Sequence, residues 1–256
     1  MLGGENKHDQ WKELKRGVEI IVASPGRLID LYKKKATNFL RVTYVVIDEA
    51  DKMFSLGFEL QMRSILGQVR PDRQILLFSA TFKKSVRNLC LDYLNNPVQI
   101  IVGKENEANE DIKQEFVVFE KLEEKMEWIL DHVPPMTEFG KVLVFVNTIK
   151  QCMDLEKIFT EFSSDTKFVT LHGNKLQYER TNIIKKFKKE ANVLIATDIA
   201  SRGLDIPAIK FVINYENPKD AEVYVHRIGR TGRGGDKEGT AITLIMKKEV
   251  RFYIKS

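Results

Sequence analysis

Tyr44-Val45-Val46-Ile47 runs directly into Asp48-Glu49-Ala50-Asp51, and this stretch decides the fold of the chain. An apolar, β-branched run of this kind is typical of a buried parallel strand. Two adjacent carboxylates follow where the strand should end, which is where open α/β sheets place their ligands. Such a strand end can deliver one carboxylate to Mg²⁺ and another to an attacking water, as in a Walker B site. A solvated acidic turn is the alternative that these residues alone leave open.

The alternation of apolar runs and helical patterns continues along the chain. Before residue 103 we expect further strands at 18–23, 74–78 and 98–102, with helices near 28–35, 58–69 and 82–94. After residue 111 we expect strands at 115–119, 141–146, 167–171, 192–196, 211–214 and 240–245, and helices near 121–132, 148–161, 176–189 and 221–228. This alternation predicts a largely parallel sheet in each half, because the connecting crossovers are right-handed.

A change of composition separates the two halves. Residues 103–111 read Gly-Lys-Glu-Asn-Glu-Ala-Asn-Glu-Asp, without apolar periodicity, which predicts a flexible linker. We therefore expect an α/β protein with a first domain at 1–103, a linker at 104–111 and a second domain at 112–256.

Composition and charge restrict the class of protein. The 256 residues are 43% hydrophobic and 30% charged, which fits a globular chain of two ordinary domains. No apolar run approaches the roughly 20 residues of a membrane helix, and residues 1–20 show no secretory signal, so we expect no membrane partner. The two cysteines make no disulfide framework, which is typical of a reducing, intracellular compartment. A net charge of +5 favours polyanionic partners only mildly.

Two motifs in the second half carry groups suited to phosphate binding. The first is His226-Arg227-Ile228-Gly229-Arg230-Thr231-Gly232-Arg233, in which basic residues alternate with glycines that permit tight turns. A helical turn would put Arg230 and Arg233 on one face, although an exposed basic helix end is the alternative. The second motif, residues 196–205, follows an apolar strand, and there Asp205 could hold a ribose hydroxyl and Thr197 could donate to a phosphate.

Taken together, these motifs resemble those of the DEAD-box family of ATP-dependent RNA helicases, in superfamily 2. The match covers nearly the whole chain in the family's order: Gly3-Gly4, 24–27, 48–51, 79–81, 144–148, His172-Gly173 with Gln177 and Arg180, 196–205 and 226–233. Asp51 and residues 226–230 favour this family over its DEAH relatives. The resemblance implies two RecA-like domains and an RNA-stimulated ATPase that uses ATP and Mg²⁺.

The resemblance implies catalytic roles for residues of both halves. Asp48 would hold Mg²⁺ through water, and Glu49 would orient or deprotonate the attacking water. Arg230 and Arg233 would act as arginine fingers on the γ-phosphate, where such groups are worth on the order of 10³–10⁵ in rate. Gly203 and Asp205 would approach the nucleotide from the second domain. Contacts that link the nucleotide state to domain closure are implied for Asp51, Ser79, Thr81 and His226.

The resemblance also implies that RNA is a partner, bound through its sugar–phosphate backbone. The implied contacts come from Pro25, Gly26, Arg27, Asn147, Thr148, Gly173, Gln177, Arg180, Thr197 and Arg202. Backbone contacts position an RNA without reading its sequence, so binding should tolerate sequence changes and weaken with salt.

One part of the family's pattern is missing from these residues. They contain no phosphate-binding loop GxxxxGK[ST] and no upstream glutamine motif that reads adenine. Without the loop, the triphosphate loses its cradle and the first sheet loses a strand, which leaves unpaired edges. We therefore expect an N-terminally truncated helicase with an incomplete first domain that is inactive by itself. The alternative is a non-catalytic module that binds RNA or protein through the second domain.

Three short segments indicate where in the cell the protein works and with which partners. Residues 33–38, 70–74 and 107–111 resemble the DEAD-box helicases associated with the spliceosome and with RNA annealing. This resemblance favours a nuclear site and spliceosomal partners. The family as a whole implies a monomer that unwinds short RNA duplexes or remodels RNA–protein complexes.

Overall fold

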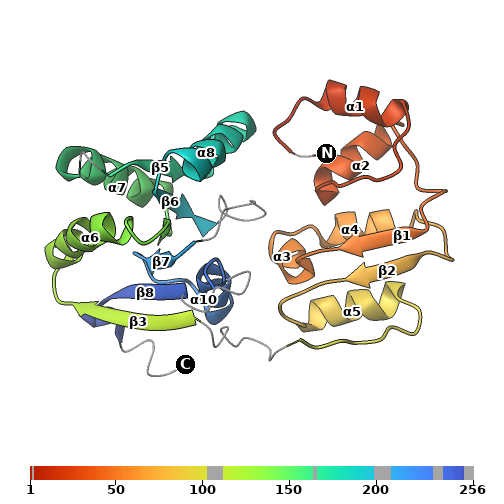
Figure 1. Ribbon diagram of the computed structural model, residues 1–256. Coiled ribbons are helices and arrows are strands. Elements are labelled where there is room, and N and C mark those ends of the chain that lie inside the picture. The colour runs from red at the N-terminus through yellow and green to blue at the C-terminus, as the bar shows by residue number, and fades with distance from the viewer. Residues whose placement is uncertain (2, 103–111, 164–165, 199–208, 233–238, 251–256) are drawn as a thin grey trace. The chain divides into compact units, whose positions relative to one another are not determined.

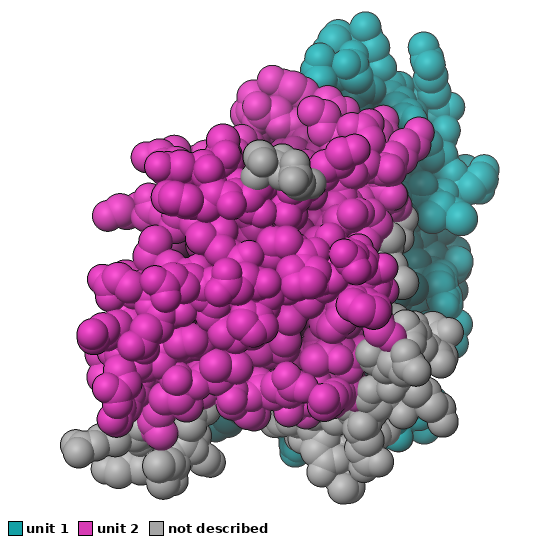
Figure 2. All heavy atoms as spheres, turned by 60° about the vertical axis from the view of Figure 1, so that its left-hand side comes forward, with its two compact units in different colours: residues 1–106 teal, residues 107–256 magenta. Residues whose placement is uncertain are grey.

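A computed structural model describes residues 1, 3–102, 112–163, 166–198, 209–232 and 239–250. The chain forms two compact units, residues 1–106 (unit 1) and 107–256 (unit 2); they are coloured teal and magenta in Figure 2. The linker predicted at 104–111 lies outside the described residues. Within the described part of the chain, no helix is both long and apolar enough to cross a membrane.

Unit 1 contains a two-stranded parallel sheet with helices packed on one face (Figure 1). Its elements are α1 (Lys7–Lys15), α2 (Pro25–Lys33), β1 (Tyr44–Ile47), α3 (Ala50–Ser55), α4 (Glu59–Leu66), β2 (Gln74–Leu77) and α5 (Lys84–Tyr93). Val45 and Ile47 face a core with α4 and α5, while the alternate side chains of Tyr44 and Val46 are 54% and 50% exposed. The expectation that β1 is buried is therefore correct for one face and wrong for the other.

Two further apolar runs of unit 1, residues 18–23 and 98–102, are not strands, so both predictions are wrong. Most of their side chains are exposed: Ile20 and Ile100 are each 82% exposed. A strand is stable when its N–H and C=O groups pair with a neighbouring strand. Neither run has such a partner among the described residues, and apolar, β-branched composition alone does not supply one.

Unit 2 is a three-layer α/β/α structure whose six strands are all parallel, as predicted (Figure 1). The strand order is β3-β8-β7-β4-β6-β5. The strands are β3 (Ile112–Phe119), β4 (Val142–Val146), β5 (Phe168–Leu171), β6 (Val193–Thr197), β7 (Phe211–Asn214) and β8 (Gly239–Met246). Its described helices are α6 (Leu122–Met136), α7 (Ile149–Phe162), α8 (Gln177–Lys189), α10 (Ala221–Ile228) and the 3₁₀ turn η1 (Lys247–Glu249).

The central strands of unit 2 are buried on both faces, which explains their unbroken apolar sequences. Side chains of β4 alternate between two cores. Val142, Val144 and Val146 pack with α6 and α7 on one face. Leu143 and Phe145 pack with α8 and α10 on the other. In the register, Val146 lies opposite Thr197, and Leu171 lies opposite Ala196, so β4, β5 and β6 end together at one edge of the sheet.

Candidate functional site

The first group of predicted site residues lies in the turn that joins β1 to α3. Asp48 is exposed, and its Oδ1 accepts a hydrogen bond from the Glu49 amide at 2.9 Å. Glu49 adopts the left-handed conformation (φ 52°, ψ 50°), which costs a residue with a Cβ roughly 1 kcal/mol or more. The Ala50 amide donates to the Phe78 carbonyl at 3.0 Å and so fastens the turn to the end of β2. The two carboxylates thus follow a strand at the carboxyl edge of the sheet.

Asp51, the second residue of α3, forms a buried polar cluster with the segment after β2. Its Oδ2 accepts from the Thr81 amide at 2.9 Å and from the Thr81 hydroxyl at 3.0 Å. The Asp51 amide donates to Ser79 Oγ, whose hydroxyl donates to the Thr81 carbonyl. Asp51 and Thr81 are 4% and 6% exposed. The structure therefore brings together three of the residues expected to link nucleotide state to closure, while the linking role itself stays a prediction.

The predicted RNA contacts of unit 1 lie in the first turn of α2, which begins at Pro25 rather than near residue 28. Arg27 is 8% exposed; its Nη1 donates to the Glu5 carbonyl and to Gln10 Oε1. Its guanidinium is therefore held inside the unit. Beside it lies a hollow of about 360 Å³, lined in part by Gly3, Lys7 and Gly26.

Six predicted RNA contacts of unit 2 lie at or after the ends of β4, β5 and β6, on the side of the shared carboxyl edge. Thr148 is exposed and caps α7, accepting the Gln151 amide at 3.2 Å. The Asn147 side chain faces inward and donates to the Asn217 carbonyl at 2.9 Å. Arg180 donates to the Lys175 and Gly173 carbonyls, 3.0 Å each. Gly173 is exposed, Gln177 begins α8, and Thr197 ends β6 and is 7% exposed.

The remaining predicted site residues are described in part. His226 is half-buried in α10, and Arg230 is half-buried just after that helix ends. Four predicted positions, Arg202, Gly203, Asp205 and Arg233, lie outside the described residues.

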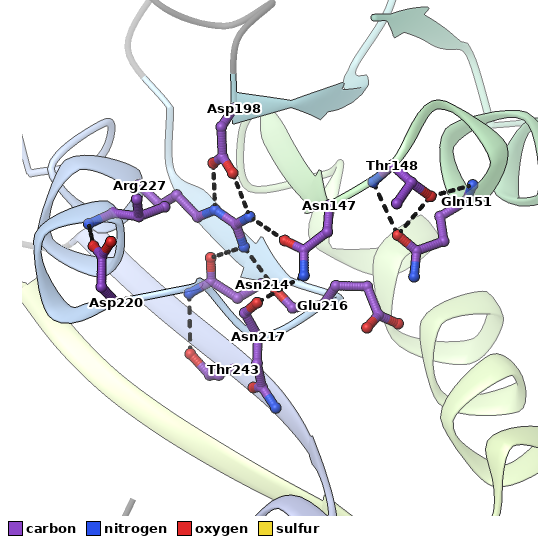
Figure 3. A network of polar contacts seen from close by, with 11 residues as sticks. Asn147, Thr148, Gln151, Asp198, Asn214, Glu216, Asn217, Asp220, Arg227 and Thr243 are labelled. Carbon is purple, nitrogen blue, oxygen red and sulfur yellow. Dashed lines mark hydrogen bonds and ion pairs between the residues drawn. The ribbon is translucent and has the colours of Figure 1, made fainter. Parts of the chain in front are cut away.

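Sequence reasoning assigned no role to Arg227 or Asp198, which form the centre of a polar network at the carboxyl edge of unit 2 (Figure 3). Asn214 and Glu216, at the end of β7, belong to the same network. Asn214 is fully buried at the end of an apolar strand. A polar side chain at the end of a buried apolar strand needs hydrogen-bond partners. Asn214 was therefore the signal in the sequence for a polar network at this edge.

His172, which follows β5, is 7% exposed. Burial lowers its pKa, and the nearby positive charge of Lys175 lowers it further. Because the folded state disfavours the imidazolium, the stabilisation is present above the unfolded pKa of about 6.5 and is lost as the pH falls below it. We expect the free energy of unfolding of unit 2 to fall between pH 7.5 and pH 5, and to fall less in His172→Gln. Urea titrations at both pH values measure this, and identical pH dependence in the two proteins would contradict it.

The arrangement defines a class of protein: an α/β protein in which polar side chains gather at the carboxyl edges of parallel sheets. Comparison with known proteins identifies the family within this class. The family models "DEAD/DEAH box helicase" and "Helicase conserved C-terminal domain" match residues 1–89 and 124–235. The chain belongs to the DEAD-box family of RNA helicases, and its units have the RecA-like fold of that family.

Three similar proteins illustrate the relationship. DEAD-box ATP-dependent RNA helicase 24 of Oryza sativa subsp. japonica is 51% identical over 98% of this chain, which spans 33% of that protein's length. A DEAD box protein from Methanococcus jannaschii is 35% identical, with a TM-score of 0.53, over 100% of this chain and 68% of its own. S. cerevisiae Dbp5, solved with RNA and ADP BeF3, is 29% identical, with a TM-score of 0.79, over 93% of this chain and 62% of its own.

Proposed function

We propose that this chain is the motif-bearing part of an ATP-dependent RNA helicase that unwinds short RNA duplexes or remodels RNA–protein complexes. The observation that carries the proposal is the placement of the two sets of residues at sheet edges. Asp48 and Glu49 follow β1 in unit 1, and the expected RNA contacts follow β4, β5 and β6 in unit 2. A family member of similar structure binds RNA together with a nucleotide analogue, which supports the same ligand pair here.

The residues of the β1–α3 turn suit a bound Mg²⁺–ATP. Asp48 offers an exposed carboxylate, and Mg²⁺ prefers such oxygen ligands while keeping several of its waters. Asp48 would therefore hold the ion through water. Glu49, fixed in its left-handed turn, would orient the attacking water. Arg230 and Arg233 would neutralise the γ-phosphate in the transition state, with Gly203 and Asp205 against the nucleotide.

RNA would lie along the carboxyl edge of unit 2 and beside the first turn of α2 in unit 1. Thr148 and the Gly173 backbone are exposed there, and both suit sugar–phosphate contacts. The inward side chains of Arg27 and Asn147 would act through the backbone that they hold. Because phosphate contacts dominate, the affinity should fall steeply with salt and vary little with sequence.

We further propose that the chain does not hydrolyse ATP by itself. Its 256 residues contain no GxxxxGK[ST] loop, so the β- and γ-phosphates would lack backbone amides and a lysine. The sheet of unit 1 has two described strands and leaves Tyr44 and Val46 half exposed. The proposed domains are therefore an incomplete first domain at 1–103, a linker at 104–111 and a second domain at 112–256.

A second function is favoured by the self-contained core of unit 2. Its six-stranded sheet is covered on both faces, so this unit could serve as a non-catalytic module for RNA or protein.

For the helicase we propose a monomer that works in the nucleus with spliceosomal partners, because residues 33–38, 70–74 and 107–111 resemble helicases of that setting.

ATP hydrolysis with and without single-stranded RNA tests the proposal. The 256-residue chain is compared with the same chain joined to a DEAD-box segment that carries GxxxxGK[ST]. Each of the two proteins is also made with the substitution Glu49→Gln. We expect RNA-stimulated turnover in the joined protein alone, and its loss in Glu49→Gln. Robust ATP hydrolysis by the 256-residue chain, abolished by Glu49→Gln, would contradict the proposed inactivity. RNA binding without turnover in the joined protein would favour the non-catalytic module.

A further inference from the structure

Arg227 is a fully bonded, buried side chain at the carboxyl edge of unit 2. It is 1% exposed, and each of its five N–H donors has an acceptor. Nε and Nη2 donate to the two carboxylate oxygens of Asp198, at 2.6 and 2.8 Å. Nη2 also donates to Asn147 Oδ1 at 2.7 Å. Nη1 donates to the Glu216 carbonyl at 2.6 Å and to Asn214 Oδ1 at 3.5 Å.

These acceptors come from three different strand ends, as Figure 3 shows. Asn147 follows β4, Asp198 follows β6, and Asn214 and Glu216 lie at the end of β7. The bonds continue outward, because Asn147 donates to the Asn217 carbonyl and Asn214 donates to the Thr243 hydroxyl in β8. One guanidinium thus joins α10 to the ends of β4, β6 and β7.

The network includes the chain neighbours of two residues that are expected to bind RNA. Thr148 is adjacent to Asn147, and Thr197 is adjacent to Asp198. The guanidinium itself is buried, with its carbon 5.1 Å from the centre of the Phe145 ring, so it does not reach an RNA. Any effect of Arg227 on RNA would therefore pass through the backbone that it holds.

We propose that Arg227 is a positioning residue: by clamping the ends of β4 and β6 onto α10, it fixes Thr148 and Thr197 in one arrangement for RNA. This inference rests on the RNA binding proposed above. The same clamp ties those strand ends to the helix that leads into Arg230, so RNA contacts and the expected nucleotide contact share one rigid support.

Two substitutions remove the clamp in different ways. Arg227→Lys keeps the charge but has three donors in place of five and no planar fork. Asp198→Asn keeps the shape and removes the carboxylate that accepts two of the bonds. Lys125→Met is the matched control. Lys125 is also 1% exposed and paired, with Glu216 at 3.2 Å and over the Tyr215 ring at 4.5 Å, but it bonds neither the end of β4 nor that of β6.

The experiment uses the full chain and two readouts, at a temperature at which all variants are folded. Amide hydrogen exchange reports the opening of 147–148 and 197–198, and fluorescence anisotropy reports the affinity for a labelled single-stranded oligouridylate. We expect Arg227→Lys and Asp198→Asn each to speed exchange in both segments, and to weaken RNA binding, by about 10-fold, since lost charge-assisted bonds are worth at least that factor. The double variant should add little to either single change, because both break one interaction.

Lys125→Met should lower global stability yet leave exchange in these two segments and RNA affinity near those of the parent. Equal losses in Lys125→Met would overturn the proposal, because destabilisation alone would then explain them. Unchanged exchange or unchanged RNA affinity in both clamp variants would also overturn it. If the parent chain binds no RNA, the proposed function fails in this chain and takes the RNA-positioning role with it; the exchange data then show separately whether Arg227 holds the loops.

Discussion

Replacing Arg230 by alanine is expected to lower ATP turnover by about 10³-fold or more in the chain joined to a phosphate-binding loop, since an arginine finger is worth that much. The affinity for single-stranded RNA should change little. Arg230 follows the end of α10, and its amide donates to the Arg227 carbonyl at 3.1 Å. The residue therefore stands on the same buried support as Arg227, while its side chain is half-buried rather than locked in the core.

Steady-state turnover and RNA anisotropy, measured on the same samples, check this prediction. Arg180→Ala is the matched control, because Arg180 is also a half-buried arginine of unit 2 and lies among the expected RNA contacts. Its loss should weaken RNA binding while turnover at saturating RNA changes far less than in Arg230→Ala. Equal losses of turnover and RNA affinity in Arg230→Ala would count against the finger role.

Unit 2 shows how much of a fold an apolar pattern can predict. All six expected strands form, because each run has a neighbour in the same unit and the central runs are buried by helices on both faces. Residues 18–23 and 98–102 have a similar composition but form no strand. Strand formation depends on a neighbouring strand whose N–H and C=O groups pair with those of the run. The local sequence does not tell whether such a neighbour is present.

The candidate site, too, could be predicted from the sequence only in part. Asp51, Ser79 and Thr81 meet as the motifs imply, since each follows one of two paired strands. The sequence did not reveal which basic residue among 226–233 turns inward. On α10 the last two positions, Arg227 and Ile228, are buried, so Arg227 serves the core while His226 and Arg230 are half-buried. Arg27 of α2, expected to contact RNA, is likewise found inside its unit.

The Phe145 side chain should be among the most costly to truncate in unit 2. Phe145 is 1% exposed near the carboxyl end of β4 and belongs to the core that β4 shares with α8 and α10. Phe145→Ala should lower the free energy of unfolding of this unit by about 3–5 kcal/mol, through lost burial and the cavity left behind. The ring also lies 5.1 Å from the Arg227 guanidinium carbon, so its loss removes a packing surface of the clamp.

Urea unfolding followed by Trp128 fluorescence measures the change in unit 2. Trp128 packs on the other core of the same unit, and a Trp11→Phe background removes the second tryptophan of the chain. Phe162→Ala is the control, because Phe162 is 65% exposed at the end of α7 and should change stability by less than about 0.5 kcal/mol. If the two variants unfold at the same urea concentration, Phe145 does not support the core as the structure indicates. If only Phe145→Ala is destabilised, faster exchange at 147–148 in that variant would tie the packing of β4 to the position of its polar end.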